Sequence, residues 1–459
     1  MKKKISYLLR TLVLLLSGFG EMHAQMPGTP VLPIREKKNI YGGSGIDPAQ
    51  CISNTSDGGY IVAGSTTSNN GIISGNHGGT DLWLMKFGSS GNMEWQKVMG
   101  GTGTEFANSV KQTADGGYII AGESTSADGD VTTGNQGSAD FWVIKLSALG
   151  ILEWQKTFGG PGDDKPFSVL QSADGGYVLA GYTEADGGDV TGYHGGNSDA
   201  WIIKLNSSGQ NIQWQKTFGG TDGEAALSIV EVNPNEYAVA GSSASSNGDL
   251  PLNNGLSDFW IFKFSYDTAA NTVNLDWSNL YGGTDHDHAR SIIRTADGGY
   301  AVAGDAASAD GLVTGNHGAQ DFWVLKLNAA GNLLWQKALG GSYMEWTQSI
   351  IQTADGGYAL AGVTLSNNGD VSGNHGAGDF WMVKLNNLGA LQWQKTYGGT
   401  NFEWANSLIR TTDNGYVLAG SSDSGNGDIS GPKYGSTDTF ILKVDAAGNI
   451  MRQWEDTAP

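Results

Sequence analysis

Short apolar runs alternate with glycine-rich turns along the chain, and one version of this pattern recurs seven times. The copy at residues 353 to 362 is TADGGYALAG, in which an Asp-Gly-Gly turn leads into the apolar run YALAG. Related copies begin at residues 55, 113, 172, 232, 295 and 411. Glycine adopts the positive φ of tight turns without steric cost, so each copy predicts a β-hairpin.

A pair of glycines marks the same point in every repeat. The pairs start at residues 42, 100, 159, 219, 282, 340 and 398, which gives a repeat of 58 to 63 residues. Each repeat holds four apolar runs, such as SIIQT, YALAG, DFWMVKL and LQWQKTY. The third run is apolar at nearly every position, so both of its faces must be covered. Radially stacked sheets meet that need, and the sequence predicts an all-β fold, a seven-bladed β-propeller with four antiparallel strands per blade.

Most tryptophans occupy two fixed registers of the repeat. Thirteen of the 15 do so, and Phe440 takes the equivalent place in the seventh copy of the third run. Because a buried aromatic side chain removes a large area from water, we expect these residues to pack between blades. They are Trp83, Trp142, Trp201, Trp260, Trp323 and Trp381 in the third run, and Trp95, Trp154, Trp214, Trp277, Trp335, Trp393 and Trp454 in the fourth.

Both ends of the repeat array carry fragments of a fourth strand. The segment EKKNIYGG before the first repeat matches the end of WQKTYGG, and MRQWED closes the last repeat. We expect one or both ends to complete the last blade, because an open edge strand exposes unpaired backbone groups.

The motifs DGGYxxAG, DFWxxKL and WQKxxGG resemble the seven-bladed β-propeller repeats of secreted bacterial proteins. The resemblance covers about residues 38 to 456. It implies a binding or adhesion component that is secreted or held at the cell surface. Such proteins often carry an added sorting or anchoring domain, and none is visible in this sequence.

The N-terminal segment has the pattern of a secretory signal peptide. It combines a basic start, an apolar run from Leu12 to Leu16 and a cleavage site after Ala24. A membrane anchor would need about 20 apolar residues, so we predict a signal peptide at 1–24 and no membrane span. The remaining divisions are a linker at 25–37, the propeller at 38–456 and a tail at 457–459. This organisation predicts a secreted, cell-surface or periplasmic protein.

Composition and charge restrict the classes of molecule that the chain is expected to bind. The chain has 71 glycines, only 16% charged residues and a formal net charge of −20. Such a surface repels nucleic acid and anionic membranes, so we expect neither as a partner, and we expect a monomer. Cys51 is the only cysteine, which excludes an internal disulfide and a cysteine-based metal site and leaves a lipid anchor unsupported.

Each repeat has an acidic residue five positions after the first glycine of its pair. These acids could form a ring that collects a cation such as Ca²⁺, which prefers several oxygen ligands. Alternatively, each could accept backbone N–H bonds and fix the crossing between blades, which its repetition in every blade favours. We therefore expect no cofactor, with calcium as the open alternative, and leave the metal ligands unassigned. The acids are Asp47, Glu105, Asp164, Glu224, Asp287, Glu345 and Glu403.

The aspartates that open the third runs, and the lysines five residues after them, are given the same structural interpretation. The loop histidines His77, His194, His317 and His375 lie in repeats 1, 3, 5 and 6, and we expect them to be too far apart to share a metal. The cluster TDHDHA at 284 to 289 offers nitrogen and oxygen donors, but alternate residues of an extended segment point in opposite directions.

The sequence contains no recognisable catalytic motif, and we assign no catalytic residue. Propeller active sites are built from scattered loops, so a polysaccharide lyase or hydrolase is the alternative to a non-catalytic binding or scaffold protein.

Two tryptophans fall outside the repeat registers, and both directly follow an acid, in MEWTQS and FEWANS; Phe106 takes the same place in TEFANS. These aromatic residues belong to repeats 6, 7 and 2. In a closed ring, repeat 1 lies between repeats 7 and 2, so the three residues fall within four consecutive repeats. Aromatic faces beside carboxylates and amides suit a carbohydrate or a peptide, so we predict a glycan or protein ligand, with local packing as the equal alternative. The predicted binding residues are Glu345, Trp346, Glu403, Trp404, Glu105 and Phe106, with Asn108, Gln348 and Asn406 nearby.

Overall fold

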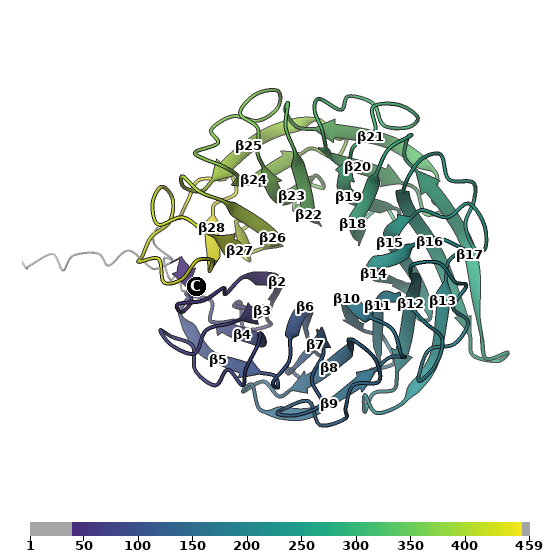
Figure 1. Ribbon diagram of the computed structural model, residues 1–459. Coiled ribbons are helices and arrows are strands. Elements are labelled where there is room, and N and C mark those ends of the chain that lie inside the picture. The colour runs from purple at the N-terminus through teal and green to yellow at the C-terminus, as the bar shows by residue number, and fades with distance from the viewer. Residues whose placement is uncertain (1–38, 452–459) are drawn as a thin grey trace, which may run out of the picture. The chain divides into compact units, whose positions relative to one another are not determined.

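The computed structural model describes residues 39–451 and contains seven four-stranded antiparallel sheets arranged around a central channel (Figure 1). These residues contain no helix, so none that could cross a membrane. The predicted seven-bladed β-propeller is confirmed. The predicted signal peptide, linker and tail, and Trp454, lie outside the described residues.

Each blade is numbered by its order in the chain, and its strands run from the channel outward. Blade 1 contains β2 (Ala49–Asn54), β3 (Tyr60–Thr66), β4 (Asp81–Phe87) and β5 (Met93–Met99), and blade 2 contains β6 (Glu105–Gln112), β7 (Tyr118–Ser124), β8 (Asp140–Leu146) and β9 (Leu152–Phe158). Blade 3 contains β10 (Asp164–Gln171), β11 (Tyr177–Thr183), β12 (Asp199–Leu205) and β13 (Ile212–Phe218), and blade 4 contains β14 (Glu224–Asn233), β15 (Glu236–Ser243), β16 (Asp258–Asp267) and β17 (Thr272–Tyr281). Blade 5 contains β18 (Asp287–Arg294), β19 (Tyr300–Ala306), β20 (Asp321–Leu327) and β21 (Leu333–Leu339), and blade 6 contains β22 (Glu345–Gln352), β23 (Tyr358–Thr364), β24 (Asp379–Leu385) and β25 (Leu391–Tyr397).

The seventh blade takes its outer edge from both ends of the array. Its inner strands are β26 (Glu403–Arg410), β27 (Tyr416–Ser422) and β28 (Asp438–Val444). The short strand β1 (Ile40–Tyr41) pairs with the start of β28, and Ile450 pairs with Val444 at its end. The edge that would otherwise be open is thus covered twice, as the sequence predicted.

The apolar core is a set of layers between neighbouring blades. One cluster, for example, joins Phe141 and Val143 of blade 2 to Leu179 and Trp201 of blade 3. The Phe141 and Trp201 ring centroids are 4.7 Å apart. The six third-strand tryptophans are fully buried. In blade 1, the Trp83 Nε1 donates to Gln96 Oε1 at 2.8 Å, so its one polar atom is satisfied without water.

The tryptophans of the fourth strands lie half-buried or buried against the next blade. The ring of Trp95 contacts Tyr118 edge-on at a centroid distance of 5.7 Å, and Trp154 contacts Tyr177 at the same distance. These tyrosines are the Tyr of the DGGY motif. The two tryptophan registers therefore pack between blades, as predicted, for all twelve members that the structure describes.

Besides forming the turn, the Asp of each DGG turn pairs with a buried lysine, a contact that the sequence did not suggest. In blade 3, Asp174 receives the ammonium of Lys204, the buried lysine of the third strand, at 2.7 Å. Partial burial raises the pKa of Asp174, but hydrogen bonds from Lys204, Ser172 and the Gly176 N–H lower it more, to about 2. The lysines of the third strands thus reach a carboxylate at the opposite end of the blade from the Gly-Gly pairs.

The junction between successive blades is held by the repeated acid. Glu345 is fully buried; one oxygen accepts the Gly341 N–H at 2.8 Å, and the other accepts the Thr364 hydroxyl at 2.8 Å. The backbone N–H bond recurs in all seven junctions, at 2.6 to 2.9 Å. The acids therefore act as hydrogen-bond acceptors that fix the crossing between blades.

A second buried carboxylate lies beside each of these acids. Asp81, which opens β4, accepts the backbone N–H and the ring Nδ1 of His77 through its Oδ2, both at 2.8 Å. Its Oδ1 is buried without a partner. A Cβ on Gly100 would lie 2.6 Å from Glu105 Oε2 and 2.8 Å from Asp81 Oδ1. The first glycine of each pair is thus required because two carboxylates close on its α-carbon.

The crowding of carboxylates at the junctions makes the stability of the fold depend on pH. At the junction of blades 2 and 3, burial raises the pKa of Asp140 to about 6 and that of Asp164 to about 7, and the charge of Asp140 adds to the second shift. Both folded-state values exceed the usual value, so the native state binds the proton more tightly than the unfolded chain. This contribution to stability is present at low pH and is lost as the pH rises from about 4 to about 7.

We expect Asp140→Asn to make stability less dependent on pH. The Asn oxygen can still accept the Gln136 N–H that now bonds Asp140 Oδ2, and its amide can donate to Asp164. Between about pH 5 and about pH 8, the melting temperature should fall less in the variant than in the unmodified protein. The exposed Asp267→Asn serves as the control; an equal or steeper fall in Asp140→Asn would contradict the assignment.

Candidate functional site

Every inner strand contains a β-bulge near its start, and the bulge points one side chain into the channel. In β6 the register with β7 shifts between Ala107 and Ser109, which leaves Asn108 out of the ladder. The same shift occurs in all seven inner strands. A bulge re-aims a side chain in this way. The seven bulge residues are Gln50, Asn108, Phe167, Leu227, Arg290, Gln348 and Asn406.

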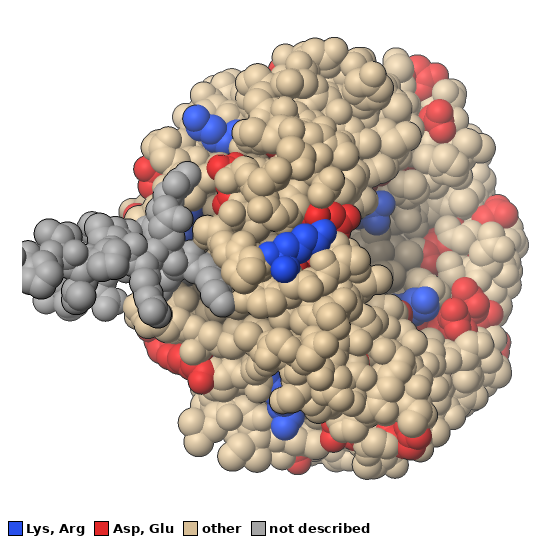
Figure 2. Space-filling model, turned by 60° about the vertical axis from the view of Figure 1, so that its left-hand side comes forward, with Lys and Arg blue, Asp and Glu red and all other residues tan. Residues whose placement is uncertain are grey.

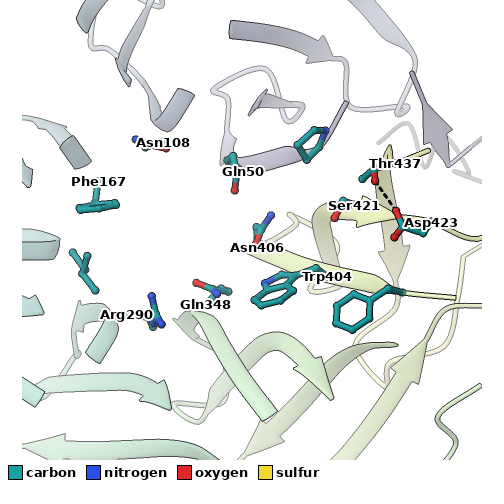
Figure 3. A pocket seen from close by; sticks show the side chains of 13 residues that line it. Gln50, Asn108, Phe167, Arg290, Gln348, Trp404, Asn406, Ser421, Asp423 and Thr437 are labelled. Carbon is teal, nitrogen blue, oxygen red and sulfur yellow. Dashed lines mark hydrogen bonds between the residues drawn. The ribbon is translucent and has the colours of Figure 1, made fainter. Parts of the chain in front are cut away.

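The bulge residues line one cavity of about 580 Å³ at the end of the channel where the inner strands begin (Figure 3). The cavity extends between blades 7 and 1. Its remaining lining residues are Pro48, Phe402, Trp404, Ser421, Asp423 and Thr437. Its volume falls in the range of small-molecule sites. We call this space the mouth cavity.

The bulge residues on the two sides of the ring differ in polarity. Blades 6, 7, 1 and 2 contribute four consecutive amides, Gln348, Asn406, Gln50 and Asn108. Blades 3 and 4 contribute apolar side chains, and blade 5 contributes Arg290. One side of the mouth cavity is therefore rich in paired donors and acceptors, and the other is apolar with a single cation.

Two of the amides are oriented by the neighbouring blade. Asn406 Nδ2 donates to the Ala49 carbonyl, and Asn108 Nδ2 donates to the Pro166 carbonyl, both at 2.8 Å. Each Oδ1 therefore remains as an acceptor. The side chains of Gln50 and Gln348 have no hydrogen-bond partner among residues 39–451, so they offer both a donor and an acceptor to a ligand.

The two surplus tryptophans lie together, as the sequence predicted. The rings of Trp346 and Trp404 stack at a centroid distance of 5.0 Å and an angle of 10°. Both side chains are half-buried. Trp404 lines the mouth cavity, whereas Trp346 is not part of the lining. Trp346 packs against Trp404 and donates its Nε1–H to Gln320 Oε1 at 2.5 Å. The Phe402 ring lies 5.9 Å from Trp404.

The other predicted binding residues do not join this pair. Phe106 is half-buried, has no aromatic contact within the described part of the chain and is not part of the cavity lining. Glu105, Glu345 and Glu403 are fully buried in the blade junctions. Adjacent residues of a strand point to opposite faces, so an acid at the first position and a ring at the second cannot share one surface.

Arg290 is held by a polar network that the sequence analysis missed. Its Nε–H donates to Asp305 Oδ1 at 3.0 Å, and Asp305 is almost fully buried. The other oxygen of Asp305 lies 3.4 Å from His288 Nδ1 and 3.5 Å from Gln320 Nε2. Gln320 also accepts from Trp346, so one network fixes both the arginine and the tryptophan pair. The only sequence signal was a single Asp after AVAG in the fifth repeat.

The histidines and acids show no metal cluster within residues 39–451. The four loop histidines each bond the aspartate that opens the following third strand, at 2.6 to 2.8 Å between Nδ1 and Oδ2. His286 and His288 both contact the Ser257 hydroxyl, at 2.9 and 3.1 Å.

No protein-family model matches the chain, and no curated protein sequence matches it. Solved structures with a similar fold include Sqt1 from Chaetomium thermophilum, with 10% identity over 90% of this chain and 85% of that chain and a TM-score of 0.44. A putative 6-phosphogluconolactonase from Bacteroides fragilis has 12% identity over 87% of this chain and 94% of that chain, with a TM-score of 0.43. The periplasmic gluconolactonase of Pseudomonas aeruginosa has 10% identity over 75% and 84%, with a TM-score of 0.43.

We expect the stacked tryptophans to stabilise each other. In a double-mutant cycle of Trp346→Leu and Trp404→Leu, urea unfolding should give a coupling free energy of about 0.5 to 1.5 kcal/mol, the range for aromatic pairs. Trp346→Leu combined with Trp154→Leu in distant blade 2 should be additive. A cycle with no coupling between the two stacked residues would show that their contact does not contribute to stability.

Proposed function

We propose that this chain is a secreted, non-catalytic binding protein that holds a glycan in the mouth cavity. The observation that supports the proposal is the combination of a half-buried indole face, Trp404, with four consecutive amides around one cavity. Sugar rings pack their C–H faces on aromatic rings and exchange hydrogen bonds with amides through their hydroxyl groups. Secretion is proposed from the N-terminal leader pattern.

The amide arc suits several ligand hydroxyls at once. Gln50 and Gln348 offer unpaired donors and acceptors, and Asn108 and Asn406 offer acceptors that the neighbouring blades hold in place. A hydroxyl both donates and accepts, so it can bridge such groups. The half of the ring formed by Phe167 and Leu227 has no such groups, which predicts an oriented ligand.

The alternative is an enzyme that acts on a polysaccharide. Glycoside hydrolysis ordinarily uses a pair of carboxyl groups that flank the bond to be broken. Among the described residues, the lining of the mouth cavity includes one, Asp423, which accepts the Thr437 hydroxyl at 2.6 Å. This single carboxylate favours binding over hydrolysis, and the assay for the proposal also detects cleavage.

We expect Trp404→Ala to weaken glycan binding roughly 5-fold to 150-fold, because loss of an aromatic anchor typically costs about 1 to 3 kcal/mol. Retention on a panel of immobilised glycans identifies the ligand, and calorimetry gives the affinity. Tyr343→Ala is the matched control, since this exposed ring lies in the loop before β22 and outside the cavity lining.

Two results would contradict the proposal. Equal binding by Trp404→Ala and the unmodified protein would move the site elsewhere. New reducing ends, or unsaturated products, released from a retained glycan would favour the enzyme instead.

A further inference from the structure

The guanidinium of Arg290 is the one cationic group in the lining of the mouth cavity. Its side chain is 34% exposed, whereas that of its partner Asp305 is 1% exposed. Asp305 receives only the Nε–H, and the two terminal nitrogens have no partner within residues 39–451. The arginine is therefore oriented by a buried carboxylate, and its terminal N–H groups remain for a ligand. Figure 3 shows the Arg290 side chain among the residues that line the cavity.

This presentation suits a carboxylate. A planar guanidinium offers parallel N–H groups at the spacing of two carboxylate oxygens, and such bidentate pairs are stronger and more specific than neutral hydrogen bonds. The network through His288 and Gln320 leaves Asp305 little freedom to move, so it keeps the fork in place before a ligand arrives.

The charge along the channel points the same way. Below the mouth, the channel lining includes Lys111 and Glu231, and Arg410 lies at the far end. With Arg290 and Asp423 of the mouth cavity included, three basic and two acidic side chains line the channel, in a chain of net charge −20. Figure 2 shows both Lys or Arg and Asp or Glu side chains around the hollow. Low-dielectric walls strengthen the attraction of such a channel for anions.

The arginine, the amides and the indole follow one another around the rim. Arg290 is in blade 5, Gln348 in blade 6, and Asn406 and Trp404 in blade 7, and all four line the same cavity. A sugar ring on Trp404 can place its hydroxyls at the amides while a carboxylate on that ring or its neighbour reaches Arg290.

We infer that the ligand is an acidic glycan built from uronic acid residues, and that Arg290 selects it by binding a carboxylate through its terminal nitrogens. This inference rests on the proposed function, and it adds the chemical class of the ligand and the residue that determines the preference.

Matched oligosaccharides test the inference. Oligomers of galacturonate, mannuronate and glucuronate are each compared with their carboxyl-reduced forms, which keep the linkages and lose the charge. We expect the unmodified protein to bind at least one acidic oligomer about tenfold or more tightly than its reduced form, with a preference that weakens as salt rises. Sulfated glycans form a further arm.

Three variants separate the contributions. Arg290→Gln should abolish the preference, because the affinity for the acidic oligomer should fall to about that for its reduced form. Arg290→Lys keeps the charge but loses the planar fork, so it should keep only part of the preference. Lys395→Gln, on the exposed face of the outer strand β25 and outside the channel, should keep it in full. Melting temperatures of all three identify any loss of folding, and Arg290→Lys retains a cation beside Asp305 if the Gln variant unfolds.

The outcomes distinguish this inference from the proposed function. If the reduced oligomers bind as tightly as the acidic ones, if Arg290→Gln keeps the preference, or if only sulfated glycans bind, the inference is wrong while glycan binding stands. If Trp404→Ala binds every oligomer as tightly as the unmodified protein, the proposed site is wrong. If no glycan binds at all, both are wrong.

Discussion

The architecture depends on a carboxylate buried at each blade junction. It accepts the N–H of the second glycine of a pair and, in most blades, a hydroxyl from the end of the second strand, so the chain that leaves one blade is tied to the sheet of the next. A second carboxylate presses on the first glycine, which leaves no room for a Cβ. In six of the seven blades the acid is the first residue of the inner strand, and in every blade it lies three residues before the bulge residue, so the same contact also sets where the bulge occurs and which side chains enter the channel.

The carboxylates at the two ends of a blade have pKa values that are shifted in opposite directions. At the junction, burial raises the pKa of Asp140 and Asp164, and neighbouring carboxylates raise both further. At the DGG turn, Lys204 lowers the pKa of Asp174. The first kind stabilises the fold more as the pH falls toward 4, and the second is lost as the pH falls through about 2. A protein with a large excess of acidic residues thus keeps its stability in mildly acidic solution.

The sequence predicted the fold because the repeats are regular and their apolar runs match sheets covered on both faces. It predicted the Trp346 and Trp404 pair because these residues are surplus to the packing registers. It failed for Glu105, Glu345 and Glu403, although strand alternation alone places them opposite the rings. The bulge ring and the contact between Arg290 and Asp305 depend on ladder register and on side chains from two strands, which spacing does not reveal. A usable signal was the third residue after each acid, which varies from Gln to Phe to Arg beside a nearly constant serine.

The bulges have a consequence for how such a protein can change. A bulge residue makes no ladder hydrogen bonds with the second strand, so replacing its side chain alters the mouth of the channel and leaves the sheet pairing intact. Seven positions of this kind, one per blade, form a combinatorial surface on a fixed frame, much as variable loops do on an antibody domain. Recognition can therefore diverge among descendants, or be redesigned, one blade at a time without a matching loss of foldability.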